Sequence, residues 1–142
     1  MSLIADLRQR PEKLSTAARF TSACGFFYLL SGLMLLVWPD LLQVVYRDPP
    51  FAGQERSLIK VIGMMLAIIG WFYVFGGRTG GRQFVAASVL DRLVLVPIVL
   101  VPIAMSGTFP KALFAFAIID PLLALIAWRL LSKADADAPS KS

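Results

Sequence analysis

The chain has 142 residues, of which 58% are hydrophobic and only 16% are charged, and its mean hydropathy is +0.73. A soluble domain is about 45–50% apolar and about 25% charged, so this composition excludes an ordinary soluble domain and indicates a membrane protein. The net charge of +5 comes without a nucleic-acid-binding motif, which argues against a nucleic-acid partner. A single cysteine and the lack of histidine exclude an intrachain disulfide, a histidine-ligated metal or haem, and a histidine general base.

Four segments are long and apolar enough to cross a bilayer, whose core of about 30 Å requires about 20 residues of helix. The predicted spans are residues 17–38, 57–75, 83–105 and 111–131. The first is interpreted as a retained helix, because its apolar region is too long for a signal peptide and no cleavage motif follows it. The predicted fold class is all-α, an integral membrane four-helix bundle. Residues 1–16 would form an N-terminal arm and residues 132–142 a flexible polar tail.

The loops carry unequal numbers of basic residues. The side with both termini has nine: Arg8, Arg10, Lys13, Arg19, Arg78, Arg82, Arg129, Lys133 and Lys141. The opposite side has four: Arg47, Arg56, Lys60 and Lys111. The positive-inside rule therefore predicts a multi-pass protein with both termini in the cytoplasm. The loop 39–56 is rich in apolar residues, and we expect it to lie in the outer interface and cover part of the bundle mouth.

Glycines recur at the same spacing in the first two spans. Gly25 and Gly32 lie seven residues apart in the first, and Gly63 and Gly70 lie seven apart in the second. Small residues on one helix face allow close helix approach in lipid. The pattern favours tight packing of these two helices on each other. An internal duplication, or use of the same faces to form an oligomer, is left open.

Charged residues interrupt the apolar spans. Asp91 and Arg92 are adjacent in the third span, Asp120 is central in the fourth, and Lys60 lies one turn inside the second. Each charge at the bilayer centre costs about 2.5–3.5 kcal/mol on insertion scales. Neighbouring residues on a helix point in different directions, so Asp91 cannot simply neutralise Arg92. Helix geometry places Arg92 and Asp120 at depths about 6 Å apart, which predicts an Arg92–Asp120 ion pair. Lys60 would either lie above this pair or snorkel outward to the interface.

Asp91 would then be joined by backbone donors, water or a hydroxyl from the first helix. The candidate hydroxyls are Thr21, Ser22, Tyr28 and Ser31, with Ser88 one turn below Arg92. The prolines of the third and fourth spans (Pro97, Pro102 and Pro121) free carbonyl groups and can widen the bundle locally. Either the charges form a structural clamp, or they line a cavity that binds a ligand. In the second interpretation the predicted ligand-binding residues are Lys60, Arg92, Asp120, Asp91, Tyr28 and Ser88.

Several stretches resemble the DoxX-like group of small bacterial membrane proteins. They are the G-x-x-Y-x-x-x-G pattern of Gly25, Tyr28 and Gly32, the segment KVIGMMLAIIG, and IIDPLL around Asp120. The resemblance covers about residues 17–131. It implies a four-helix bundle of the bacterial inner membrane and an association with a redox or quinone-linked system. It transfers no catalytic or binding residue.

Catalysis is poorly supported. Both glutamates, Glu12 and Glu55, lie outside the spans, and no recognisable base accompanies a serine. No catalytic residue, metal site or cofactor is assigned. We expect a small accessory protein that binds a lipid, quinone or other amphiphile in a polar-lined intramembrane cavity. The alternatives are a small oligomeric proton-coupled transporter that uses Asp91 or Asp120, and an enzyme acting on a membrane-soluble substrate. A second copy of the chain or another membrane protein is left open as a partner.

Overall fold

The computed structural model describes residues 13–136 of the chain, and the side chains of residues 13–133. Its elements are α2 (Thr16–Val37), α3 (Leu41–Tyr46), α4 (Glu55–Arg78), α5 (Arg82–Leu90), the π-helical turn η1 (Asp91–Leu95), α6 (Val96–Met105) and α7 (Pro110–Ala136). Every element of this part of the chain is helical, which confirms the all-α prediction. Residues 1–12 of the predicted arm and 137–142 of the predicted tail lie outside the described residues. The helix α7 extends to Ala136, beyond the predicted end of the fourth span.

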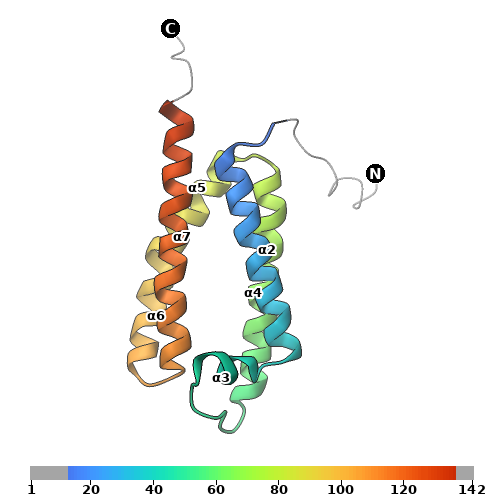
Figure 1. Cartoon of the computed structure of the whole chain (residues 1–142), viewed down its shortest axis with the longest axis vertical. Coiled ribbons are helices and arrows are strands. Elements are labelled where there is room, and N and C mark those ends of the chain that lie inside the picture. Colours follow the sequence, from blue (N-terminus) through green and yellow to red (C-terminus); the bar gives the residue numbers. More distant parts are fainter. Residues whose placement is uncertain (1–12, 137–142) are drawn as a thin grey trace.

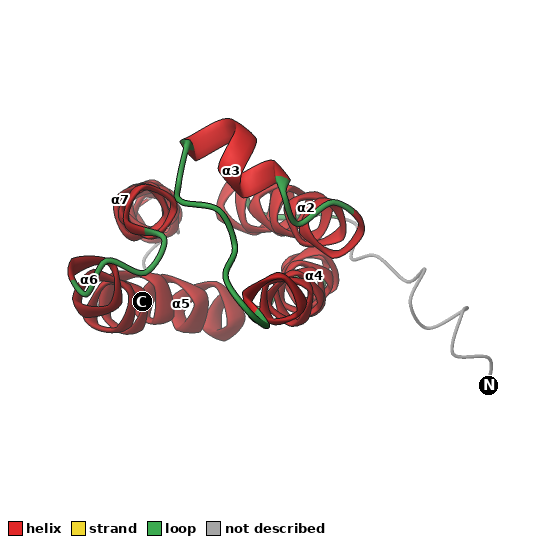
Figure 2. Ribbon diagram, turned by 90° about the horizontal axis from the view of Figure 1, so that it is seen from below, coloured by secondary structure: helices red, strands yellow, loops and turns green. Residues whose placement is uncertain are grey.

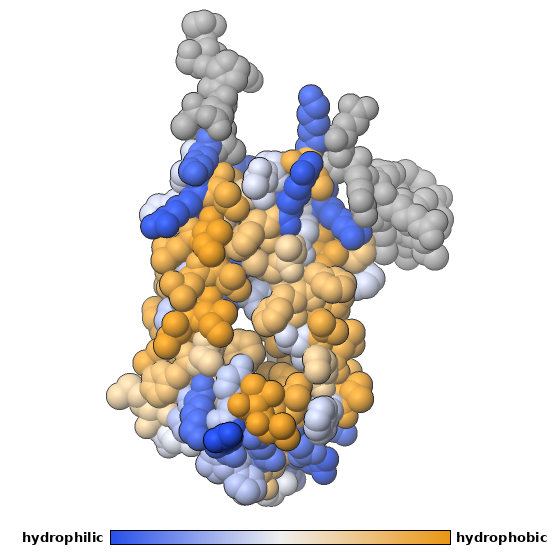
Figure 3. Space-filling view, in the orientation of Figure 1, coloured by the Kyte–Doolittle hydropathy of each residue, from blue (hydrophilic) through white to orange (hydrophobic). Residues whose placement is uncertain are grey.

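Four helices within the described residues are long and apolar enough to cross a membrane. They are Thr16–Val37, Glu55–Arg78, Arg82–Met105 and Pro110–Lys133, the third being α5, η1 and α6 in succession. Large apolar side chains point outward along them, among them Phe26, Ile62 and Leu122. An apolar band separates hydrophilic residues at the two ends of the molecule (Figure 3). The chain is therefore a multi-pass membrane protein with the predicted four-helix architecture.

The glycines of α2 and α4 hold these two helices in close contact. A Cβ atom added at Gly70 would lie 2.7 Å from the Gly25 carbonyl oxygen, and one at Gly63 would lie 2.8 Å from the Gly32 carbonyl oxygen. Real Cβ atoms essentially never come so close to another heavy atom, so only glycine permits this approach. The predicted packing of the first two spans is confirmed. Because these faces lie against each other, they are not free to join a second copy of the chain.

The four spans form two pairs, α2 with α4 and α6 with α7 (Figures 1 and 2). The beginning of α2 and the end of α7 lie at the same end of the bundle, here called the terminal end. The opposite end, where α3 lies, is called the α3 end (Figure 1). The third span passes from one pair to the other. Its first part, α5, contacts α2, α4 and α7, whereas α6 packs along α7. The η1 turn lies at this crossing point, about halfway through the bundle.

The α3 end is closed by the apolar loop, as its composition predicted. Leu42 of α3 is buried in a cluster with Leu35, Ile59 and Ala112, which come from α2, α4 and α7. The buried carboxylate of Asp48 accepts hydrogen bonds from the backbone N–H groups of Lys111 (3.2 Å) and Ala112 (3.0 Å). These donors lie in the first turn of α7, where helix N–H groups lack partners within the helix. The loop therefore fastens the two helix pairs together at this end.

Candidate functional site

A cavity of about 620 Å³ separates the two helix pairs. Its walls are mostly apolar and include Leu66 and Ile69 of α4, Val99 of α6 and Phe116 of α7. Its polar lining residues in the middle of the bundle are Tyr28, Tyr73, Asp91, Arg92 and Asp120, so that all four spans contribute. A volume of about 300–1,000 Å³ with mainly apolar walls and a few converging polar groups is typical of small-molecule sites.

Arg92 lies completely buried at the polar part of this cavity, with an exposed fraction of 0%. Its Nε donates to the carbonyl oxygen of Ser88 at 3.0 Å, and its Nη2 lies 3.4 Å from the Ser88 hydroxyl oxygen. The Ser88 hydroxyl in turn donates to the Val85 carbonyl at 2.8 Å. The second terminal nitrogen, Nη1, is buried without a hydrogen-bond partner. One strong donor of a buried cation is therefore left unused.

Tyr73 of α4 connects the two adjacent charges. Its hydroxyl lies 3.4 Å from the Asp91 carboxylate, and the guanidinium carbon of Arg92 lies 5.4 Å from the centroid of its ring. The first contact is a long hydrogen bond, and the second is within the range of a cation–π interaction. Asp91 and Arg92 thus point to different sides of their helix. Arg92 is buried, Asp91 is exposed, and one tyrosine contacts both.

The π-helical turn explains how the third span places these charges. At its end the N–H of Val96 donates to the carbonyl of Asp91, five residues earlier. Pro97, the second residue of α6, cannot donate a hydrogen bond, and its ring crowds the carbonyl four residues before it. A wider turn immediately before the proline relieves this crowding. Single π turns of this kind are frequently found at functional sites.

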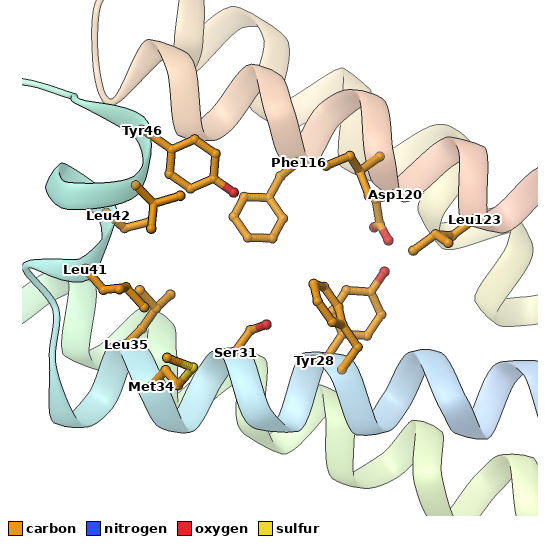
Figure 4. Close-up of a pocket in the computed structure, with 13 residues that line it drawn as sticks. Tyr28, Ser31, Met34, Leu35, Leu41, Leu42, Tyr46, Phe116, Asp120 and Leu123 are labelled. Atoms are coloured by element: carbon orange, nitrogen blue, oxygen red, sulfur yellow. The ribbon is translucent and has the colours of Figure 1, made fainter.

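Asp120 and Tyr28 face each other on the opposite side of the site. Their side chains point toward one another across the gap between α7 and α2 (Figure 4). Both are at least nine-tenths buried, and the Tyr28 hydroxyl and the Asp120 Oδ1 lack hydrogen-bond partners. They also line a smaller cavity of about 150 Å³ that extends from here along α2 toward α3. Buried polar atoms without partners are rare and call for an explanation.

The predicted ion pair between Arg92 and Asp120 is wrong. In the described part of the chain no salt bridge joins them, although both are buried and line the same cavity. Side chains on a helix lean toward its N-terminus. Because the two spans are antiparallel, Arg92 leans toward the terminal end and Asp120 toward the α3 end. This divergence adds to the difference in depth, and Arg92 donates to Ser88 of its own helix instead.

The structure places Lys60 outside the cavity, as in the outward alternative, so it does not join the other predicted ligand-binding residues. Its side chain is exposed, and Lys60 is not among the residues that line the cavity. Since α4 begins at the α3 end, a side chain leaning toward its N-terminus points away from Asp120. The other five predicted site residues lie in or beside the polar part of the cavity: Tyr28, Asp91, Arg92 and Asp120 line it, and Ser88 holds Arg92.

Among the described residues, none of the hydroxyls proposed as partners of Asp91 hydrogen-bonds to it. Ser22 donates to the Val74 carbonyl at 3.2 Å, Ser31 lines the smaller cavity, and the Thr21 hydroxyl is buried without a partner. Sequence reasoning missed Tyr73, the residue that does contact Asp91. The available signal was that Tyr73 is the second tyrosine within a span, and that a buried phenol needs a partner.

Cys24 was also missed as a neighbour of the site. It packs with Tyr28 and Tyr73 and lies within electrostatic reach of Arg92 and Asp120. Among the described residues, no group of three or more histidine, cysteine or acidic side chains is placed to hold a metal ion. The polar side-chain groups in or beside the site are one guanidinium, two carboxyl groups, two phenols, the Ser88 hydroxyl and a thiol.

Comparison with known proteins adds no family: no protein-family model, curated protein or solved structure matches this chain. The resemblance to the DoxX-like group therefore stays a prediction.

Proposed function

We propose that the protein binds a membrane-soluble amphiphile, such as a lipid or a quinone, in the cavity between its two helix pairs. The apolar part of the ligand would lie along α4 and α6, and its polar head would reach Arg92, Asp120 and Tyr28. The observation that carries the proposal is that each of these three side chains has a buried polar atom without a partner at the same cavity. A ligand head that satisfies these atoms would offset the cost of burying them.

The route into the cavity also supports a ligand from the bilayer. Several of its lining residues have side chains that are at least half exposed. They include Leu58 and Ile62 of α4 and Leu95 of η1. No extensive contact joins α4 to α6. The cavity is therefore open sideways to the lipid, and a hydrophobic molecule could enter without crossing the polar interface.

Binding is favoured over transport and catalysis. Among the described residues that line the cavity none belongs to α5, so the cavity ends near the middle of the bundle and does not continue to the terminal end. A transporter opens to the two sides in turn, and binding accounts for a cavity that is closed toward the terminal end without a second state. A catalytic role would need a nucleophile or base in contact with the ligand. The unpartnered atoms of Arg92, Asp120 and Tyr28 are better suited to holding a head group.

The test is to purify the full chain from membranes in a mild detergent and identify bound small molecules by native mass spectrometry. We expect an amphiphile on the wild-type protein and at least a tenfold loss of occupancy in Arg92→Met, because a hydrogen bond to a charged group contributes about 1.5–3 kcal/mol. Lys60→Met is the matched control, since it removes a positive charge outside the cavity. An empty wild-type protein, or equal occupancy in both variants, would contradict the proposal.

We further infer that the protein lies in a bacterial inner membrane with the terminal end in the cytoplasm. Basic residues described at that end include Lys13, Arg19, Arg78, Arg129 and Lys133, in keeping with the positive-inside rule. A Cys24→Ala background with either Gln54→Cys or Ser132→Cys tests the orientation with a membrane-impermeant maleimide. Intact spheroplasts should label the first variant and not the second, and the opposite pattern would reverse the topology.

A further inference from the structure

We infer that the head group of the bound amphiphile is uncharged and carries a hydrogen-bond acceptor beside a hydroxyl donor, as in an acylglycerol or a hydroxyketone. This inference rests on the proposed function and specifies its ligand. It follows from the signs of the charges around the cavity and from the donor or acceptor character of the unpartnered atoms.

The charges near the polar part of the cavity disfavour an ionic head. Among the described residues that line the cavity Arg92 is the only basic one, and Asp91 and Asp120 lie in the same region. An anionic head that reached Arg92 would also approach two carboxyl groups. A cationic head that reached the carboxyl groups would approach the buried guanidinium. Like charges brought together in a medium of low dielectric repel strongly, so an uncharged head avoids both penalties.

The unpartnered atoms require a head that both accepts and donates. Arginine can only donate, so Arg92 Nη1 needs an acceptor such as a carbonyl oxygen. The free Asp120 Oδ1 is satisfied by a hydroxyl donor. The Tyr28 hydroxyl can take either role, and its position facing Asp120 allows it to share the same ligand hydroxyl (Figure 4). A carbonyl or ester next to a hydroxyl supplies both partners on neighbouring atoms.

A panel of ligands with the same oleyl tail tests this inference on the full chain in phosphatidylcholine nanodiscs. The first probe, 1-oleoylglycerol, has both an acceptor and a hydroxyl donor. Methyl oleate has an acceptor only, and oleyl alcohol has a hydroxyl but no carbonyl. The two ionic probes are oleate and oleylamine. Binding is measured by native mass spectrometry and by the shift in thermal unfolding. We expect 1-oleoylglycerol to bind at least about tenfold more tightly than either ionic probe, and more tightly than both single-function probes.

Two variants assign the preference to the named atoms. Arg92→Met should lower the affinity for 1-oleoylglycerol to that of oleyl alcohol, since the carbonyl loses its donor. Tyr28→Phe removes one hydroxyl without changing charge. It should lower the affinity for 1-oleoylglycerol several-fold and leave the affinity for methyl oleate unchanged. This variant keeps the test decisive if Arg92→Met does not fold.

The outcomes separate the two proposals. If oleate or oleylamine binds most tightly, or if all five probes bind equally, the inference about the head group is overturned while amphiphile binding stands. If no probe binds and the protein purified from membranes is also empty, the proposed function fails together with the inference.

Discussion

Replacement of Gly70 by alanine should open the contact between α2 and α4. The added methyl group would lie 2.7 Å from the Gly25 carbonyl oxygen and from the Leu29 Cα, and closer still to the Leu29 backbone nitrogen. Ordinary contact begins at 3.4 Å, so the helices must separate by about 0.7 Å or more. All three atoms belong to backbone, and no side-chain rotation can relieve the clash.

The expected loss of stability follows from two opposing effects. Overpacking costs about 1–3 kcal/mol, and a clash with backbone belongs at the upper end of that range. Alanine in place of glycine within a helix stabilises by about 1 kcal/mol. The net loss should be about 2 kcal/mol. Because α2 carries Tyr28 and α4 carries Tyr73, the same separation should also weaken binding of 1-oleoylglycerol.

The single cysteine provides the assay. Cys24 is buried beside Tyr28 and Tyr73, so its rate of reaction with a maleimide in micelles reports how often the α2–α4 contact opens. A loss of 2 kcal/mol corresponds to roughly 30-fold faster labelling. Gly81→Ser is the control, because the nearest atoms to an added Cβ there are 3.3 and 3.8 Å away. Equal labelling rates in Gly70→Ala and Gly81→Ser would refute the packing described for these helices.

Three further predictions concern the loop and the site. Asp48→Ala removes the acceptor of two N–H groups at the start of α7 and should cost about 0.5–2 kcal/mol in thermal unfolding; Asp48→Asn should retain most of that stability, and equal stability of Asp48→Ala and wild type would contradict the capping role. Tyr73→Phe removes the hydroxyl beside Asp91 and should lower the free energy of unfolding by about 0.5–1.5 kcal/mol. A double-mutant cycle with Asp91→Asn should show coupling, and strict additivity would mean that the 3.4 Å contact contributes nothing. Arg92→Met should leave the ligand-free protein within about 1 kcal/mol of wild type, because loss of the hydrogen bonds to Ser88 is offset by removal of a buried cation with no ion-pair partner among the described residues. A loss of about 3–5 kcal/mol, as for a broken buried pair, would show that Arg92 is a structural clamp.

The architecture could be predicted from the sequence because its causes are local. Length and hydropathy decide whether a segment can span a bilayer, and the four spans of the structure agree with the predicted ones to within a few residues. The seven-residue glycine spacing is also a local property, and it identified the faces on which α2 and α4 meet. Depth along a span, counted in residues, placed Arg92 and Asp120 near each other, and both line the same cavity.

The contacts within the site could not be predicted in this way, because they depend on side-chain direction and on the rotation of whole helices. Antiparallel spans tilt Arg92 and Asp120 away from each other, and the wide turn before Pro97 presents Asp91 to Tyr73. The crossing of the third span from one helix pair to the other creates the cavity itself. The order of residues along the chain therefore determined that this chain spans a membrane and carries charges within its spans, whereas tertiary packing decided which of the buried polar atoms were left without a partner.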